Sequence, residues 1–85
     1  MADILQSTLA DFLASTAAKQ PTPGGGAVTA LCGALAASLA TMALRYTAAK
    51  KAFAAHEGEI QAAIGQLERA GVLLRELIEI GRAHV

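Results

Sequence analysis

The sequence predicts an all-α protein, a helical bundle with a long buried central helix. Apolar residues recur at every third or fourth position through most of the 85 residues, and no stretch alternates apolar and polar residues as a strand would. Hydrophobic residues make up 54% of the chain and charged residues only 16%. The periodic pattern divides into three helical segments, at residues 8–18, 25–49 and 51–79.

The first segment, residues 8–18, reads as a short amphipathic helix. Ser7 or Thr8 can cap its first turn with a side-chain oxygen. Pro21 stops it, because proline has no backbone N–H and cannot continue a helix. Its large apolar side chains share one stripe, and they are Leu5, Leu9, Phe12 and Leu13.

The second segment, residues 25–49, is apolar or small on all sides, so we expect it to be buried on several sides. We expect Cys32 to be buried there as a small hydrophobic residue. One ridge of larger side chains comprises Val28, Leu31, Leu35, Leu39, Met42 and Tyr46. Two rows of small residues comprise Gly26, Ala30, Ala34 and Ser38, and Gly33, Ala37 and Thr41.

The uncharged stretch from Gly24 to Leu44 also has the length of a membrane-spanning helix. Ala, Gly, Ser and Thr dominate it, no aromatic belt flanks it, and basic residues follow only at its far end. This composition favours a buried helix of a soluble bundle. A membrane segment stays the alternative.

The third segment, residues 51–79, is amphipathic. Its apolar face comprises Phe53, Ile60, Ile64, Leu67, Leu74 and Ile78. Its charged face comprises Glu57, Glu59, Glu68, Arg69, Arg75, Glu76 and Glu79.

Charge and cysteine content bear on the partners and the compartment to be expected. Seven basic and seven acidic side chains give a formal net charge of zero, which provides no reason to expect nucleic acid or an anionic membrane as a partner. The single cysteine cannot form an internal disulfide, which fits a reducing compartment. The first six residues contain an acid and no base, unlike a secretory signal. We therefore expect a cytoplasmic protein.

The motif Pro21-Thr22-Pro23-Gly24-Gly25-Gly26 precedes the central helix. It is no P-loop, because no Gly-Lys-Ser/Thr follows, and no dinucleotide fingerprint, because no strand precedes it. Two interpretations remain open. Its backbone N–H groups can favour an anion at a helix N-terminus, or its glycines can form a tight turn that lets helices pack closely.

Three cations, Arg45, Lys50 and Lys51, gather at the far end of the same helix. They either complement the helix dipole or clamp an anionic ligand. The nearby stretch His56-Glu57-Gly58-Glu59 resembles half of a zinc motif, but Ile60 stands where the second histidine would be. We therefore expect a solvated face there and no metal site.

Together these motifs resemble the cyclodeaminase/cyclohydrolase family, which comprises the C-terminal domain of formiminotransferase-cyclodeaminase and the bacterial methenyltetrahydrofolate cyclohydrolases. The resemblance is carried by Leu9-x-x-Phe12-Leu13, by the Pro-x-Pro-Gly-Gly-Gly element with the small-residue helix after it, and by Thr47-x-x-Lys50-Lys51. One departure is Ala49, where the family usually has glycine.

The resemblance implies an all-helical, homodimeric enzyme that acts on a one-carbon unit between N5 and N10 of tetrahydrofolate. It is either a cyclodeaminase, which releases ammonia, or a cyclohydrolase, which opens the methenyl ring with water. No metal and no organic cofactor is implied beyond the folate substrate. The implied substrate-binding residues are Thr22, Gly24, Gly25, Gly26, Thr47, Lys50 and Lys51. A non-catalytic helical dimerisation or interaction module stays the alternative.

The last six residues, Ile80-Gly81-Arg82-Ala83-His84-Val85, break the periodicity of the third segment. Written in common codons, they resemble a short-read sequencing adapter. We expect residues 1–79 to be the N-terminal part of a larger domain and residues 80–85 to be a non-native tail. The acidic element of the family would follow Glu79, so the catalytic residues stay unknown, and we expect this chain to be inactive as written.

Overall fold

The computed structural model describes residues 4–20 and 23–81, which contain three α-helices, two short 3₁₀ helices and no strand. The all-α prediction is confirmed. In chain order the elements are η1 (Ile4–Gln6), α1 (Leu9–Ala17), α2 (Gly25–Ala48), η2 (Lys51–His56) and α3 (Glu57–Gly81).

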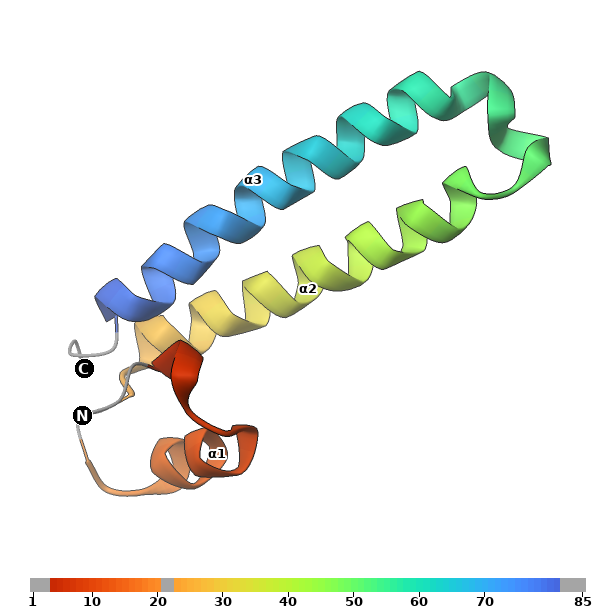
Figure 1. The fold of residues 1–85 in the computed structure, drawn as a ribbon. Helices are drawn as coiled ribbons and strands as arrows, with labels where there is room; N and C mark the ends of the chain where they lie inside the picture. The colour runs from red at the N-terminus through yellow and green to blue at the C-terminus, as the bar shows by residue number, and fades with distance from the viewer. Residues whose placement is uncertain (1–3, 21–22, 82–85) are drawn as a thin grey trace.

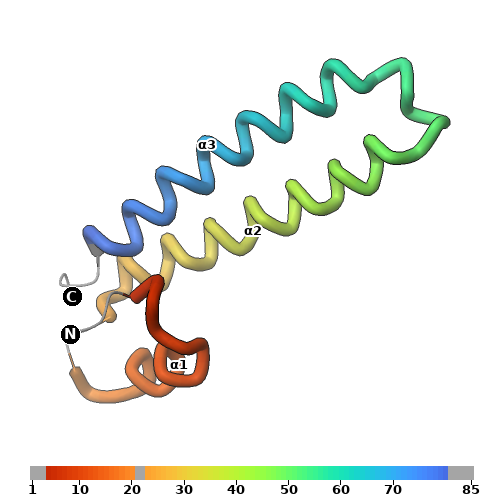
Figure 2. Tube along the Cα trace, viewed as in Figure 1, coloured from red at the N-terminus to blue at the C-terminus, as the bar shows by residue number. Residues whose placement is uncertain are grey.

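Helices α2 and α3 form a long antiparallel hairpin, and α1 lies at the end where α2 begins (Figure 1). The 3₁₀ helix η2 makes the turn at the opposite end, which we call the hairpin tip (Figure 2). The principal extents of 51 × 21 × 17 Å describe an elongated molecule. The hairpin therefore separates two ends, one glycine-rich and one lysine-rich.

The core of the hairpin joins small residues of α2 to large residues of α3. The buried residues are Ala27, Ala30 and Thr41 on α2, and Ile60, Ile64 and Ile78 on α3. Small side chains on one helix let the facing helix approach closely, and the isoleucines then fill the space between them. The predicted rows of small residues and the predicted apolar face of the third segment both contribute to this contact.

Gly33 marks a point of close approach between the two helices. A Cβ at this position would lie 3.1 Å from Cδ2 of Leu74. Gly33→Val adds a branched side chain against that contact, so we expect a loss of about 1–3 kcal/mol in the free energy of unfolding. Urea unfolding followed by circular dichroism measures it. Ala36→Val, at an exposed position of the same helix, is the matched control. Equal stability of the two variants would contradict the close approach of Gly33 to Leu74.

The start of α1 follows the prediction, but its apolar stripe does not. Thr8 is the N-cap, and its Oγ1 accepts a hydrogen bond of 3.0 Å from the backbone N–H of Asp11. Phe12 is the only member of the stripe that is buried, whereas Leu9 and Leu13 are exposed. α2 and α3 pack mainly on each other, so a helix of nine residues beside their end buries little more than one large side chain.

The third segment differs from its prediction at both ends. Residues 51–56 form η2 rather than α-helix, because Lys50 is extended (φ −87°, ψ 129°) and interrupts the helical backbone. At the other end α3 continues to Gly81, two residues past the predicted end, because no proline stops it there. Residues 82–85 of the proposed tail lie outside the described residues.

The expectation that α2 is buried on several sides is wrong for this chain. Opposite α3 lies a stripe that we call the seam, and all of it is exposed except Val28, which is half-buried. Cys32 belongs to the seam and is exposed, so the expected burial of this residue is wrong. Leu31, a member of the predicted ridge, is half-buried and lies outside the seam. The seam comprises Val28, Cys32, Leu35, Leu39, Met42 and Tyr46.

By length and composition alone, α2 meets the criteria for a membrane-crossing helix. Only 17% of its most apolar window is buried within the chain. This low burial reflects the seam, because α3 covers one side of α2 and the large side chains lie on the other.

Candidate functional site

The glycine-rich end of the predicted site begins at Gly24, the N-cap of α2. Gly24 is extended (φ −80°, ψ 168°), and no side chain caps the helix. The first turn of α2 carries no acidic residue. The first backbone N–H groups of a helix have no intrahelical partner, so this end favours a negative charge. Thr22, also predicted to bind substrate, lies outside the described residues.

Gly25 and Gly26 are exposed and leave open space beside the backbone. A Cβ at either position would meet no atom within 4 Å. These two glycines therefore do not serve close packing within the chain, in contrast to Gly33. Gly24 itself is buried, so of the two interpretations of the motif the geometry favours a helix N-terminus that is accessible at Gly25 and Gly26.

The lysine-rich end lies at the hairpin tip. Thr47 Oγ1 donates a hydrogen bond of 3.0 Å to the carbonyl of Ala43, which fixes its side chain along α2. Lys50 and Lys51 follow, and both are exposed. Ala49 has ordinary right-handed helical geometry (φ −75°, ψ −11°), so the family's usual glycine is not needed for this backbone.

The structure does not bring the two ends together within one copy. α2 has 24 residues, so Gly25 and Ala48 lie roughly 35 Å apart along the helix. Lys50 and Lys51 lie beyond Ala48, at the far end of the hairpin (Figure 1). One small molecule cannot contact both halves of the predicted site in a single chain.

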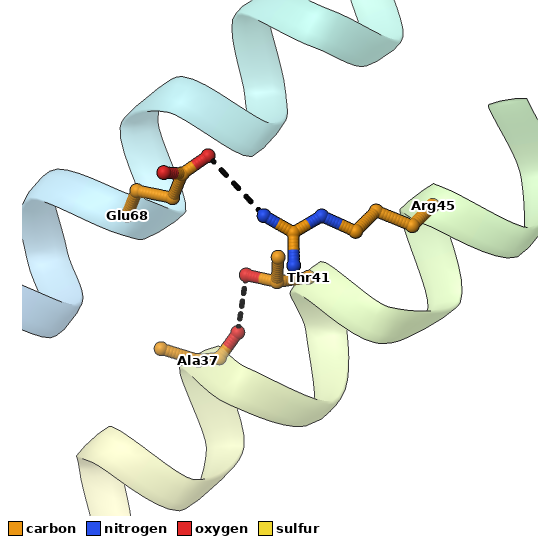
Figure 3. A network of polar contacts seen from close by, with 4 residues as sticks. All are labelled: Ala37, Thr41, Arg45 and Glu68. Atoms are coloured by element: carbon orange, nitrogen blue, oxygen red, sulfur yellow. Dashed lines mark hydrogen bonds and ion pairs between the residues drawn. The ribbon is translucent and has the colours of Figure 1, made fainter.

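Arg45 does not join the two lysines, although the sequence groups the three cations. Its guanidinium Nη2 lies 3.6 Å from Oε1 of Glu68 on α3, and Thr41 donates a hydrogen bond of 2.8 Å to the carbonyl of Ala37 one turn away (Figure 3). Both side chains of the ion pair are more than half exposed, so it contributes at most about 1 kcal/mol.

A groove of about 340 Å³ between α2 and α3 contains this ion pair. The groove is open because the facing residues are small. A Cβ added at Gly71 would meet no atom within 4 Å. The sequence did not predict this groove, because its position depends on the register between α2 and α3. The small residues on both helices were the one sequence feature that could have indicated it. Its polar lining comprises Ser38, Thr41, Arg45, Glu68 and Arg75.

His56 is exposed, and its Nδ1 lies 3.9 Å from Oε1 of Glu59. Among residues 4–20 and 23–81, no group of three His, Cys, Asp or Glu side chains could hold a metal ion. The solvated face predicted around His56 is confirmed.

A comparison with protein families gives the context for these features. The family model described as formiminotransferase-cyclodeaminase matches residues 8–80. The comparisons with curated proteins and with solved structures gave no match. The matched range includes both ends of α2 and every residue of the predicted site.

Proposed function

The chain belongs to the formiminotransferase-cyclodeaminase family, and from this premise we propose that it is part of a domain that acts in the interconversion of one-carbon units carried by tetrahydrofolate. The methenyl derivative carries its one-carbon unit between N5 and N10. A cyclodeaminase closes the formimino group to the methenyl ring and releases ammonia. A cyclohydrolase opens that ring with water to the formyl derivative. The proposal includes both reactions, because the two share the methenyl derivative.

The proposed substrate-binding groups are the helix N-terminus at Gly24–Gly26 and the side chains of Thr47, Lys50 and Lys51. The glutamate part of folate carries carboxylates, and an ammonium group or a helix N-terminus attracts such an anion. The tetrahydrofolate derivative is itself the substrate, and the proposal requires no metal and no organic cofactor. We further propose a cytoplasmic homodimer.

The observation that carries the proposal, together with the family match, is the state of the two lysines. Lys50 and Lys51 are exposed at the tip, and within the described residues neither ammonium group forms an ion pair. Arg45, by contrast, is occupied by Glu68. The positive charge at the tip is therefore available to an anionic ligand.

Replacing these lysines separates ligand binding from folding. We expect Lys50→Ala and Lys51→Ala each to weaken binding of methenyltetrahydrofolate about tenfold, because each removes a hydrogen bond between charged groups. Stability should stay within about 0.5 kcal/mol, because both side chains are exposed. Titrations at two salt concentrations measure the effect, and the difference should shrink at high salt.

Arg69→Ala is the matched control, because Arg69 is an exposed cation near the middle of α3, away from both ends of the predicted site. Its binding should equal that of the unchanged chain. Equal affinity of all three variants would return Lys50 and Lys51 to a role in complementing the helix dipole.

A second candidate is a non-catalytic interaction module, which the exposed seam of α2 favours. Such a module would associate through the seam and bind no tetrahydrofolate derivative. The same titration therefore separates the two candidates. A membrane segment, the third class, would require detergent to stay in solution.

A further inference from the structure

We propose that Phe53 determines which anions bind at the hairpin tip, because its ring stacks on an aromatic ring of the ligand while Lys50 and Lys51 hold the carboxylates. In a folate this ring is the aminobenzoyl group. The inference rests on the proposed function, since it adds one residue and a ligand class to the same site. The exposure of Phe53 and the geometry of η2 carry it.

The packing of the chain does not account for Phe53. Its side chain is 41% exposed, and no residue of η2 is buried. The other phenylalanine, Phe12, is buried. The sequence predicts that Phe53 shares an apolar face with Ile60 and Ile64, but the two isoleucines are buried and Phe53 is not. A large ring at the surface of the tip is therefore accessible to a ligand.

The backbone of η2 places Phe53 beside Lys50. The backbone N–H of Phe53 donates a hydrogen bond of 3.1 Å to the carbonyl of Lys50, which closes one turn. A 3₁₀ helix has three residues per turn, so side chains three positions apart lie on the same edge, about 6 Å apart along the axis. Lys50 is the N-cap of η2, and its side chain and that of Phe53 begin on the same side of this turn.

These neighbouring groups match the chemistry of a folate. One amide bond joins the aminobenzoyl ring to the glutamate, so a flat ring and a carboxylate lie close together in one molecule. An ammonium group binds the carboxylate, and an aromatic side chain packs against the ring in an offset or edge-on arrangement. A ligand with carboxylates and no ring would use the lysines alone. Phe53 therefore favours an aryl carboxylate over other anions.

The charges around η2 give the ligand one direction. Lys50 and Lys51 precede Phe53, whereas Glu57 and Glu59 follow it in the first turn of α3. A carboxylate on the far side of Phe53 would approach these acids and be repelled. The glutamate end of a folate therefore faces the lysines, and its ring lies at Phe53.

Three ligands and two substitutions test the role of Phe53. The ligands are methenyltetrahydrofolate, p-aminobenzoylglutamate and the peptide triglutamate, which has carboxylates and no ring. Phe53→Leu keeps an apolar side chain and removes the ring, so binding of the two ring-bearing ligands should weaken about tenfold. Binding of triglutamate should not change. Phe53→Tyr keeps the ring and should bind all three ligands like the unchanged chain.

The pattern across the ligands separates stacking from a structural role. Lys50→Ala should weaken binding of all three ligands, because each of them carries a carboxylate. Loss of packing at the tip would also weaken all three and would lower the urea concentration at which the chain unfolds. Phe53→Leu should instead unfold like the unchanged chain. If Phe53→Leu weakened binding of triglutamate as much as that of the ring-bearing ligands, the inference would be overturned.

Two further results separate this inference from the proposed function. Equal binding of the ring-bearing ligands by Phe53→Leu and the unchanged chain would overturn the inference and leave the function standing. Binding of p-aminobenzoylglutamate that depends on Phe53, without binding of methenyltetrahydrofolate, would overturn the function and leave a site for aryl carboxylates. A folded chain that binds neither ring-bearing ligand would overturn both.

Discussion

Ile78→Asp is expected to unfold the helical hairpin. Ile78 on α3 has no exposed surface, the only large side chain buried so completely among the described residues. The substitution removes a buried apolar side chain and places a carboxylate in its position. We expect a cost of at least about 4 kcal/mol. One core in a chain of this size provides only about 3–5 kcal/mol, so the folded state should be lost.

Circular dichroism and urea unfolding measure this loss. Leu77→Asp is the matched control, because Leu77 is the neighbouring residue and is 42% exposed. It should keep most of the helical signal and a cooperative transition. If Ile78→Asp unfolded at the same urea concentration as the control, the placement of Ile78 in the core would be wrong.

Leu39→Glu is expected to dissociate the proposed homodimer. Leu39 lies in the middle of the seam, 61% exposed in the single chain, so the hairpin core does not depend on it. A glutamate there places a carboxylate against the apolar side chains of the second copy. We expect the dimer dissociation constant to rise at least about 100-fold, which corresponds to about 2.7 kcal/mol. Helical content should stay the same.

Sedimentation of the Leu39→Glu variant and of the unchanged chain, each across a range of concentrations, measures this change in the dissociation constant. Ala40→Glu, at an exposed position of α2 outside the seam, is the control and should associate like the unchanged chain. A Leu39→Glu chain that stays dimeric at the same concentrations would exclude the seam as the interface.

The helices and their ends follow closely from the sequence, because local signals specify them. Thr8 caps α1, the glycine-rich motif begins α2, and α2 ends within one residue of its prediction. The buried face of α2 was not predictable in the same way. Both of its sides are apolar, so the hydrophobic pattern does not select one of them. The small side chains face α3 because its isoleucines need room, and this leaves the large ones exposed.

The residues of the candidate site could be proposed from the sequence, but their grouping could not. The separation of Gly25 from Lys50 does follow from the length of α2, since each helical residue advances the chain by about 1.5 Å. The separation of Arg45 from the lysines does not, because its partner Glu68 lies on another helix. Only the packing register between α2 and α3 decides which charges meet.

Binding of methenyltetrahydrofolate to the unchanged chain tests the central claim most directly. In an equilibrium titration at low salt, the account predicts saturable binding of one ligand per chain. Affinity should fall as salt is raised, because the binding groups are exposed charges. A titration that shows no saturable binding up to millimolar ligand, with the chain folded and helical, would contradict the account.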